Sequence, residues 1–265
     1  MPELAEVEYY RSQWNPGIGD RVVKVSLHAT RRIFRGTNIR ALSRGLTAAR
    51  LLRSEARGKR MLFRFENDQW LGLHLGMTGK MWIEPADFHP GKHEHFVLFQ
   101  KSRALVFRDA RQFGRVQYHR GKTAPAWWSE SDPPEIVSAK FTRAFFDRFL
   151  ARHGKAPIKA VLLMQAGFSG VGNWVADEIL WRARVLPSHR AGKLNDKQRA
   201  LLFRATKFVA REALRIIGKD FSDPPRTWLL HERWNNKGKC PRDGTTLKRA
   251  TIGGRTTAWC GQCQH

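Results

Sequence analysis

Short apolar runs separated by turn residues dominate the sequence between about residues 20 and 120. They are 61–66 (MLFRFE), 70–77 (WLGLHLGM), 96–100 (FVLFQ), 104–109 (ALVFRD) and 115–120 (RVQYHR). In the last run Val116 and Tyr118 alternate with polar residues, which is the two-residue period of a strand with one buried face. Runs of this length and spacing predict a β-sandwich or a barrel.

Beyond residue 135 the apolar residues recur at helical spacing instead. We expect helices over 141–154, 157–167 and 173–186. The second of them opens on Pro157 in its first turn and ends at Gly167. The stretch 121–135 between the two patterns is rich in proline, serine and charge and has no period, so we expect it to be a linker.

The chain begins MPELAEVEYYR, which predicts an N-terminal helix. Proline suits the first helical position because its missing N–H would have no partner there, and Glu3 and Glu6 would complement the helix dipole. A second interpretation rests on chemistry that only a chain terminus allows. Removal of Met1 would leave Pro2 with a free secondary amine, a nucleophile that can form an iminium with an aldehyde-like carbon. These residues alone leave both interpretations open.

The charge of the chain changes this picture. Lys and Arg number 48 against 23 Asp and Glu, a formal charge of +25, in a sequence of 265 residues that is still 42% hydrophobic. The basic residues are scattered among apolar ones, so we expect them to lie on folded surfaces and to bind a polyanionic partner, nucleic acid. The sequence shows no signal-peptide core and no run near the roughly 20 apolar residues that cross a bilayer, so we expect a soluble intracellular protein.

The segment 166–173, AGFSGVGN, joins two of the predicted helices. Its glycines permit a tight reversal, and Asn173 stands where an N-cap residue belongs. Free N–H groups at such a helix start can bind a phosphate, and Lys159 lies about one helix earlier in this basic chain. An ordinary helical hairpin turn explains the same residues, so both interpretations remain open.

Three cysteines near the C-terminus are too few for a disulfide framework. Cys260 and Cys263 are spaced C-x2-C, and Cys240 with Asp243 repeats that spacing across a hairpin-like segment. Three thiolates and a carboxylate form an allowed tetrahedral zinc site, because carboxylate oxygen is an accepted zinc ligand. His265 is an alternative fourth ligand, and a metal-free hairpin with three thiols is a further alternative.

Seven motifs span essentially the whole chain: PELAEVE, GKRMLF, HLGMTG, DARQFG, PIK, SGVGNWVADE and GGRTTAWCGQC. In these motifs, and in their order, the sequence resembles the formamidopyrimidine-DNA glycosylase and endonuclease VIII family of base-excision repair enzymes. Leu4 and the EVE triplet favour the formamidopyrimidine branch. Two residues depart from the family pattern, since Ala5 replaces a usual proline and Asp243 replaces a zinc cysteine.

The resemblance implies an α+β fold with three parts. These are an N-terminal β-sandwich domain with an N-terminal helix (1–125), a helical helix-two-turn-helix domain (136–234) and a zinc-finger β-hairpin (235–265). It also implies one structural zinc ion and, as partner, double-stranded DNA that contains a damaged base or an abasic site. We expect a monomer in the bacterial cytoplasm, associated with the nucleoid and not with a membrane.

The resemblance further implies catalytic roles. Pro2 would attack C1′ of the damaged nucleotide, displace the base and leave an iminium that permits β- and then δ-elimination. At reference pKa values about a quarter of an α-amino group is unprotonated near pH 7.4, against roughly a thousandth of a lysine. Glu3 would protonate the opening sugar ring, Glu6 would be structural, and Lys59 would hold a phosphate beside the reacting sugar.

A second implied set of residues handles the DNA. Met77, Arg111 and Phe113 would fill the space left by the everted nucleotide. Composition alone favours core packing for Met77 and Phe113 and a solvated face for Arg111. Phosphate contacts would come from Lys159, Asn173 and Arg255, and such contacts position DNA without reading its sequence.

Two other classes of function stay open. One is a catalytically silent DNA-binding protein on the same scaffold, and the other is a basic ribosome-associated or RNA-binding protein. The presence of Pro2, Glu3 and Lys59 disfavours both, because binding alone requires none of them.

The resemblance also bears on the substrate. In formamidopyrimidine-DNA glycosylases a long glycine-containing loop ahead of the zinc hairpin covers everted 8-oxoguanine, whereas only the 18 residues 222–239 separate Phe221 from Cys240 here. Pro224 and Pro225 stiffen this segment. We therefore expect weak 8-oxoguanine excision and better action on oxidised pyrimidines, ring-opened purines or other bulky lesions, with cover from another segment as the alternative.

Overall fold

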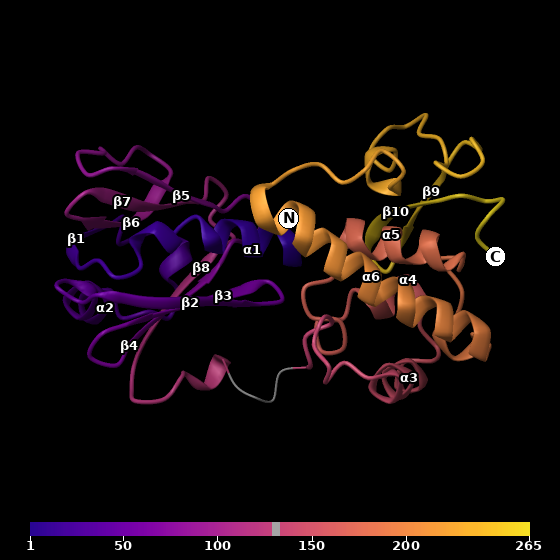
Figure 1. The fold of residues 1–265 in the computed structure, drawn as a ribbon, viewed down its shortest axis with the longest axis horizontal. Helices are drawn as coiled ribbons and strands as arrows, with labels where there is room; N and C mark the ends of the chain where they lie inside the picture. The colour runs from indigo at the N-terminus through magenta and orange to yellow at the C-terminus, as the bar shows by residue number, and fades with distance from the viewer. Residues whose placement is uncertain (129–132) are drawn as a thin grey trace. The chain divides into compact units, whose positions relative to one another are not determined.

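The computed structural model describes residues 1–128 and 133–265. Contacts divide the chain into two compact units. Figure 1 shows the chain coloured by residue number. The first contains Met1–Pro2 and Glu6–Asp132, and the second contains Glu3–Ala5 and Pro133–His265. Residues near the N-terminus therefore belong to the second unit, which the sequence patterns do not predict.

The first unit is built on two four-stranded antiparallel sheets, which confirms the predicted sandwich. One sheet has the order β1 (Val22–Leu27), β6 (Glu94–Gln100), β7 (Arg103–Arg108) and β5 (Lys80–Pro85). The other has the order β2 (Leu51–Arg57), β3 (Arg60–Phe65), β4 (Gln69–His74) and β8 (Arg115–Arg120). Helix α1 (Leu4–Ser12) precedes the strands, and α2 (Ile39–Leu46) follows β1.

Apolar side chains from both sheets form one core. Trp14, which is fully buried, has its ring 5.0 Å from that of Phe63 on β3 and 6.4 Å from that of Phe96 on β6. Each such aromatic side chain contributes roughly 1.5–3 kcal/mol by leaving water. The five predicted apolar runs all lie in strands of this sandwich, because alternate residues of each face the shared core.

The predicted linker 121–135 is wrong in part. Residues 126–128 form a short 3-10 helix, and Trp128 is buried beneath the guanidinium groups of Arg57 and Arg60, 5.0 and 5.5 Å from its ring. Residues 129–132 lie outside the described part of the chain. Cation–π contacts thus hold the first part of this segment against the sandwich.

The second unit contains four α-helices and a β-hairpin (Figure 1). They are α3 (Arg143–Arg152), α4 (Ile158–Leu162), α5 (Asn173–Ala183), α6 (Asp196–Asp220), and the hairpin strands β9 (Lys248–Ile252) and β10 (Arg255–Trp259). α4 stops at Leu162, short of the predicted end at Gly167, and Pro157 is its N-cap. α5 is buried along nearly its whole length and therefore forms the centre of this unit.

Local sequence signals begin two of these helices. The hydroxyl of Thr142 accepts from Phe145 N at the start of α3, and Asn195 and Gln198 form a reciprocal capping box at the start of α6. Among the described residues no helix is long and apolar enough to cross a bilayer.

Candidate functional site

The Glu3 carboxylate caps helix α5. Its Oε2 accepts from Gly172 N at 2.8 Å and from Val175 N at 3.1 Å, and its Oε1 accepts from Trp174 N at 3.0 Å. The first N–H groups of a helix lack partners within the helix, and the positive end of the helix dipole favours an anion there. The predicted place of Glu3 in the first turn of its own helix is wrong, because α1 begins one residue later at Leu4.

The glycine before α5 makes room for this carboxylate. Gly172 is the N-cap of α5, and a Cβ at this position would overlap the Glu3 carboxylate. Asn173 is the first residue of the helix and not its predicted N-cap. The backbone N–H groups of Gly172, Trp174 and Val175 are thus occupied by the protein's own Glu3 and are not available to a phosphate, whereas the role of the Asn173 side chain stays a prediction.

Pro2 and Lys59 belong to the first unit. Pro2 is half-buried and follows Met1, whose side chain is half-exposed. Lys59 lies in the turn between β2 and β3 and is partly buried. It stands in a basic neighbourhood, because its charge is among those that lower the pKa of His74.

His74, at the end of β4, is a residue that the sequence analysis did not single out. Burial lowers its pKa, and the charges of Lys59, Arg35 and Arg60 lower it further. Its Nδ1 accepts from Gly76 N at 3.0 Å, which assigns the proton of the neutral ring to Nε2. The imidazole is therefore an uncharged donor among cations, and its place in the HLGMTG motif was the available signal.

A cavity of about 280 Å³ adjoins His74. Its lining includes Arg35, Arg60, His74, Phe113, Arg115 and Trp127. Three guanidinium groups and a neutral imidazole donor supply positive charge and N–H groups, and among the described residues no carboxylate lines the cavity. This lining suits an anion such as a backbone phosphate.

The three predicted wedge residues lie on two loops at the surface of the first unit. Met77 is 41% exposed and Phe113 is 42% exposed, so the core-packing interpretation of both is wrong. The guanidinium of Arg111 lies 4.8 Å from the centre of the Phe113 ring, which pairs these two side chains. Large apolar groups that protrude in this way are available to another molecule.

A buried carboxylate joins the two wedge loops. Asp109 is fully buried, and its oxygens accept from the Thr78 hydroxyl at 2.7 Å and from Gly114 N at 2.6 Å. Thr78 follows Met77, and Gly114 follows Phe113, so one side chain fixes both wedge positions. Sequence reasoning missed Asp109 because neither of its partners is apparent before folding, although the DARQFG motif contains it.

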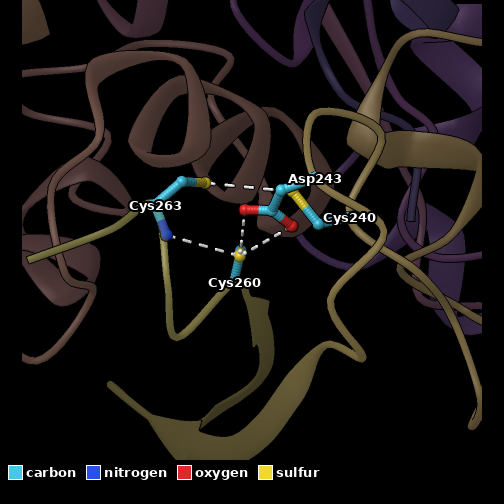
Figure 2. Close-up of side chains that lie close together, drawn as sticks. All are labelled: Cys240, Asp243, Cys260 and Cys263. Atoms are coloured by element: carbon cyan, nitrogen blue, oxygen red, sulfur yellow. Dashed lines mark hydrogen bonds between the residues drawn. The ribbon is translucent and has the colours of Figure 1, made fainter.

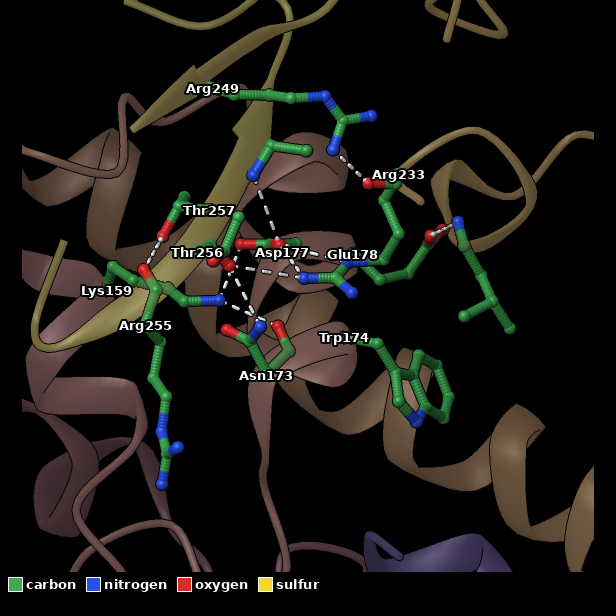
Figure 3. Close-up of polar contacts among 12 residues, drawn as sticks. Lys159, Asn173, Trp174, Asp177, Glu178, Arg233, Arg249, Arg255, Thr256 and Thr257 are labelled. Atoms are coloured by element: carbon green, nitrogen blue, oxygen red, sulfur yellow. Dashed lines mark hydrogen bonds and ion pairs between the residues drawn. The ribbon is translucent and has the colours of Figure 1, made fainter. Parts of the chain in front are cut away.

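Lys159 does not reach the surface, and its predicted phosphate contact is wrong. The side chain is fully buried, with Nζ 2.5 Å from Asp177 Oδ1 and 2.7 Å from the carbonyl oxygen of Asn173 (Figure 3). Arg255 is exposed at the start of β10, and the Asn173 side-chain amide donates to the Thr256 carbonyl at 2.9 Å. Asn173 and Arg255 are thus close in the fold, whereas Lys159 supports them from beneath.

The predicted metal ligands converge at the other end of the hairpin (Figure 2). Ligand atoms of Cys240, Asp243, Cys260 and Cys263 all lie within 4.8 Å of one another. The Sγ atoms of Cys240 and Cys263 are 3.8 Å apart, and Cys260 Sγ is 3.3 Å from Asp243 Oδ2. Bonds of about 2.3 Å in a tetrahedral site place neighbouring sulfurs about 3.8 Å apart. The cluster therefore fits a zinc ion, and among the described residues Asp243 completes it, not His265.

Comparison with known proteins decides the family. Residues 1–116 match the formamidopyrimidine-DNA glycosylase N-terminal domain, and residues 133–223 match the formamidopyrimidine-DNA glycosylase H2TH domain. The formamidopyrimidine-DNA glycosylase of Thermus thermophilus is 34% identical over 275 positions, covering 100% of this chain and 98% of that protein. The chain belongs to the formamidopyrimidine-DNA glycosylase family. The resemblance seen in the motifs is confirmed.

Solved structures of the family share the fold. The Lactococcus lactis formamidopyrimidine-DNA glycosylase bound non-covalently to DNA with an abasic site superposes with a TM-score of 0.87 at 25% identity, over 99% of both chains. The same enzyme with DNA containing an oxidised pyrimidine gives a TM-score of 0.90 at 26% identity, over 100% of both chains. A relative from Geotalea daltonii is 30% identical over 285 positions and is covered completely.

The space at Gly172 generates a prediction. Gly172→Ala should displace the Glu3 carboxylate from the start of α5 and lower the rate of incision of abasic duplex DNA by about a hundredfold, the usual effect of a 1 Å misplacement at a reacting centre. Gly91→Ala is the control, because an added Cβ there would meet only Glu94 Oε2, the end of a flexible side chain that can move aside. Single-turnover rates near the wild-type value for Gly172→Ala would contradict the role of this cap.

Proposed function

We propose that this chain is a bifunctional DNA glycosylase and abasic-site lyase of base-excision repair that removes oxidised or ring-opened bases from double-stranded DNA. It belongs over its full length to a family whose Lactococcus lactis member has been crystallised with abasic-site DNA. The formal charge of +25 suits the polyanionic substrate. The observation that carries the proposal is Pro2, the second residue of the chain, followed directly by a carboxylate that three N–H groups hold in place.

The proposed nucleophile is the secondary amine of Pro2 after removal of Met1. Its nitrogen lone pair forms a bond to C1′ while the glycosidic bond breaks, and the bonding electrons leave with the base, which takes up a proton. The attached nitrogen then gives up its proton, and its lone pair forms the C1′=N bond of an iminium while the C1′–O4′ bond breaks and O4′ takes up a proton. The positive charge of this iminium acidifies C2′–H. Loss of that proton expels the 3′ phosphate, and a second elimination expels the 5′ phosphate.

Glu3 acts beside this nitrogen. Its carboxylate oxygens are acceptors in three hydrogen bonds from backbone N–H groups, which fix their position at the start of α5. An anion adjacent in the chain to Pro2 stabilises the developing iminium and the sugar cation. This geometry favours electrostatic stabilisation over the proton donation expected from the sequence, since donation requires that Glu3 first take up a proton.

Lys59 and the cavity beside His74 are the proposed grip on the phosphates next to the reacting sugar. The guanidinium groups of Arg35, Arg60 and Arg115 and the Nε2–H of His74 supply the donors. Met77, Arg111 and Phe113 protrude nearby in the same unit as the proposed wedge. Asn173 and Arg255 are the proposed phosphate contacts of the second unit.

We propose that the cluster of Cys240, Asp243, Cys260 and Cys263 holds one zinc ion, which when bound fixes the fold of the hairpin. Two further donors support thiolate sulfurs in this role. Trp181 Nε1 lies 3.3 Å from Cys240 Sγ, and Arg242 Nη1 lies 3.7 Å from Cys263 Sγ. Such contacts orient metal ligands and offset their negative charge.

The lesion preference follows from the segment 222–239. Trp228 packs against Trp174 of α5, and Leu229 is fully buried. Leu230 N donates to the carboxylate of Glu178 at 3.3 Å. Residues 228–230 are thus anchored in the core of the unit. Of the mostly exposed residues 222–227, Pro224 and Pro225 have no N–H to offer to a purine. We therefore propose weak excision of 8-oxoguanine. The polar groups of an everted 8-oxoguanine would lack hydrogen-bond partners in this segment, and a buried polar group without a partner weakens binding.

The first experiment tests the lyase itself. Wild-type protein should cut duplex DNA at an abasic site and leave phosphates at both ends of a one-nucleotide gap. Protein that retains Met1, in which the Pro2 nitrogen is an amide, should cleave at least about a hundredfold more slowly while DNA affinity stays within a few fold, because an amide nitrogen is not a nucleophile. Gel analysis of the end groups distinguishes the products. Intact DNA with the wild type would refute the proposal and favour a silent DNA-binding protein.

The wedge gives a comparison of two substrates. Met77→Ala or Phe113→Ala should lower excision of a damaged base from duplex DNA about tenfold or more, and should lower cleavage at a preformed abasic site far less. Less stacking opposes eversion in the second substrate, so the wedge contributes less. Ile83 on β5 is similarly exposed and is not one of the proposed wedge residues, so Ile83→Ala provides the control. Equal losses on both substrates would assign these residues to structure.

The metal prediction separates two candidate ligands. Freshly purified protein should contain one zinc per chain, Asp243→Ala should lose most of it, and His265→Ala should retain it. Elemental analysis and circular dichroism after a chelator challenge measure both effects. Zinc-free active enzyme, or an unchanged zinc content in Asp243→Ala, would contradict the proposed ligand set.

The lesion prediction requires a panel of duplexes that differ in one base. Single-turnover rates should be higher for an oxidised pyrimidine and for a ring-opened purine than for 8-oxoguanine opposite cytosine, with the abasic-site lyase rate as internal reference. If 8-oxoguanine opposite cytosine is the fastest substrate, another segment covers the base and the argument from residues 222–239 is wrong.

A further inference from the structure

A buried carboxylate lies at the centre of the second unit (Figure 3). Asp177 is fully buried, and its Oδ1 accepts from Lys159 Nζ at 2.5 Å. Its Oδ2 accepts from Arg233 at 3.1 and 2.6 Å and from Ala258 N at 3.3 Å. Lys159 and Arg233 are themselves 0% and 2% exposed, so neither cation is available to DNA.

These contacts join four separate segments. Lys159 lies on α4, Asp177 on α5, Arg233 in the segment ahead of the hairpin, and Ala258 on β10. The burial of three charges is tolerated because each is paired, and the removal of one would leave the others uncompensated. The position of the hairpin relative to α5 therefore depends on Asp177.

A single carbonyl transmits this position to the proposed phosphate contacts. The oxygen of Thr256 accepts from the Asn173 side-chain amide at 2.9 Å and from Arg233 Nη2 at 3.4 Å. Thr256 directly follows Arg255, whose side chain is exposed. Lys159 Nζ also holds the main-chain oxygen of Asn173 at 2.7 Å. Asn173 is thus joined to the Asp177 cluster by its bonds to the Thr256 carbonyl and to Lys159. Arg255 is joined to it through the peptide bond to Thr256, whose carbonyl also accepts from Arg233.

We infer that Asp177, with Lys159 and Arg233, is a positioning residue that sets Arg255 beside Asn173, so that the two bind DNA phosphate as one unit. The inference rests on the proposed DNA-binding role of Arg255. Asp177 touches no DNA itself and acts through the hairpin. Its loss should weaken DNA binding only to the extent that Arg255 is misplaced.

A double-mutant cycle tests this route. Asp177→Asn and Arg255→Ala should each weaken binding to duplex DNA containing an abasic-site analogue by about tenfold, the usual effect of one charge-assisted contact. Each should also lower the slope of log K against log salt by about one phosphate. Asp177→Asn added to Arg255→Ala should change the affinity less than twofold. Fluorescence anisotropy at several salt concentrations, well below the melting temperature, gives all of these quantities.

Glu178→Gln is the matched control. Glu178 is the next residue of α5 and equally buried, but its carboxylate pairs with Arg182 and Leu230 N and not with the hairpin. Its substitution should leave the salt slope unchanged. If Asp177→Asn fails to fold by circular dichroism, Arg233→Lys replaces it, since this variant keeps the charge and loses the paired contact with Asp177.

Two results would overturn the inference. Equal losses from Asp177→Asn in the wild-type and Arg255→Ala backgrounds would show that Asp177 does not act through Arg255. If Arg255→Ala binds DNA as tightly as the wild type, Arg255 makes no phosphate contact and Asp177 has no such positioning role. Cleavage of abasic DNA by the wild type would in that case still support the proposed enzyme.

Discussion

The hydrogen bonds between Glu3 and the start of α5 determine how this protein holds its N-terminus. Three N–H groups converge on one carboxylate, and Leu4 N donates to the Gly170 carbonyl at 3.0 Å. Ala5 is fully buried in the core of the second unit, which holds the start of α1 there. Pro2 directly precedes this anchored segment. The attachment matters for the proposed nucleophile, because an amine held in one orientation reacts faster than one on a mobile chain end.

Buried carboxylates that accept several hydrogen bonds also hold the other proposed functional segments in place. Asp109 fixes the two wedge loops, and Asp177 fixes the hairpin that carries Arg255. In a chain of charge +25 these acids are buried and fully paired, while most cations remain outside. Negative charge organises the interior and positive charge contacts the polyanion. This division explains how a strongly basic protein presents side chains at defined positions despite the mutual repulsion of its surface.

Sequence patterns predicted the parts of the structure that depend on local periodicity and spacing. Strands β3, β4, β6, β7 and β8, helices α3 and α5, and the cluster of Asp243 with three cysteines all follow from residues close together in the chain or evenly spaced. Strands β1, β2 and β5 were not predicted. The burial of Lys159 could not be predicted in this way, because a lysine is expected to be exposed unless a buried partner, here Asp177, is known. The N-cap of α5 was missed for a similar reason, since the capping carboxylate comes from Glu3, 169 residues away from Gly172.

The central claim is that the amine of Pro2 is the nucleophile, and the site of covalent attachment tests it most directly. Reaction with abasic duplex DNA in the presence of borohydride reduces an iminium to a stable amine, and peptide mapping by mass spectrometry locates it. The account predicts an adduct on the N-terminal peptide, at Pro2, with Met1 absent. An adduct on a lysine, or no adduct in a preparation that cleaves abasic DNA, would contradict it.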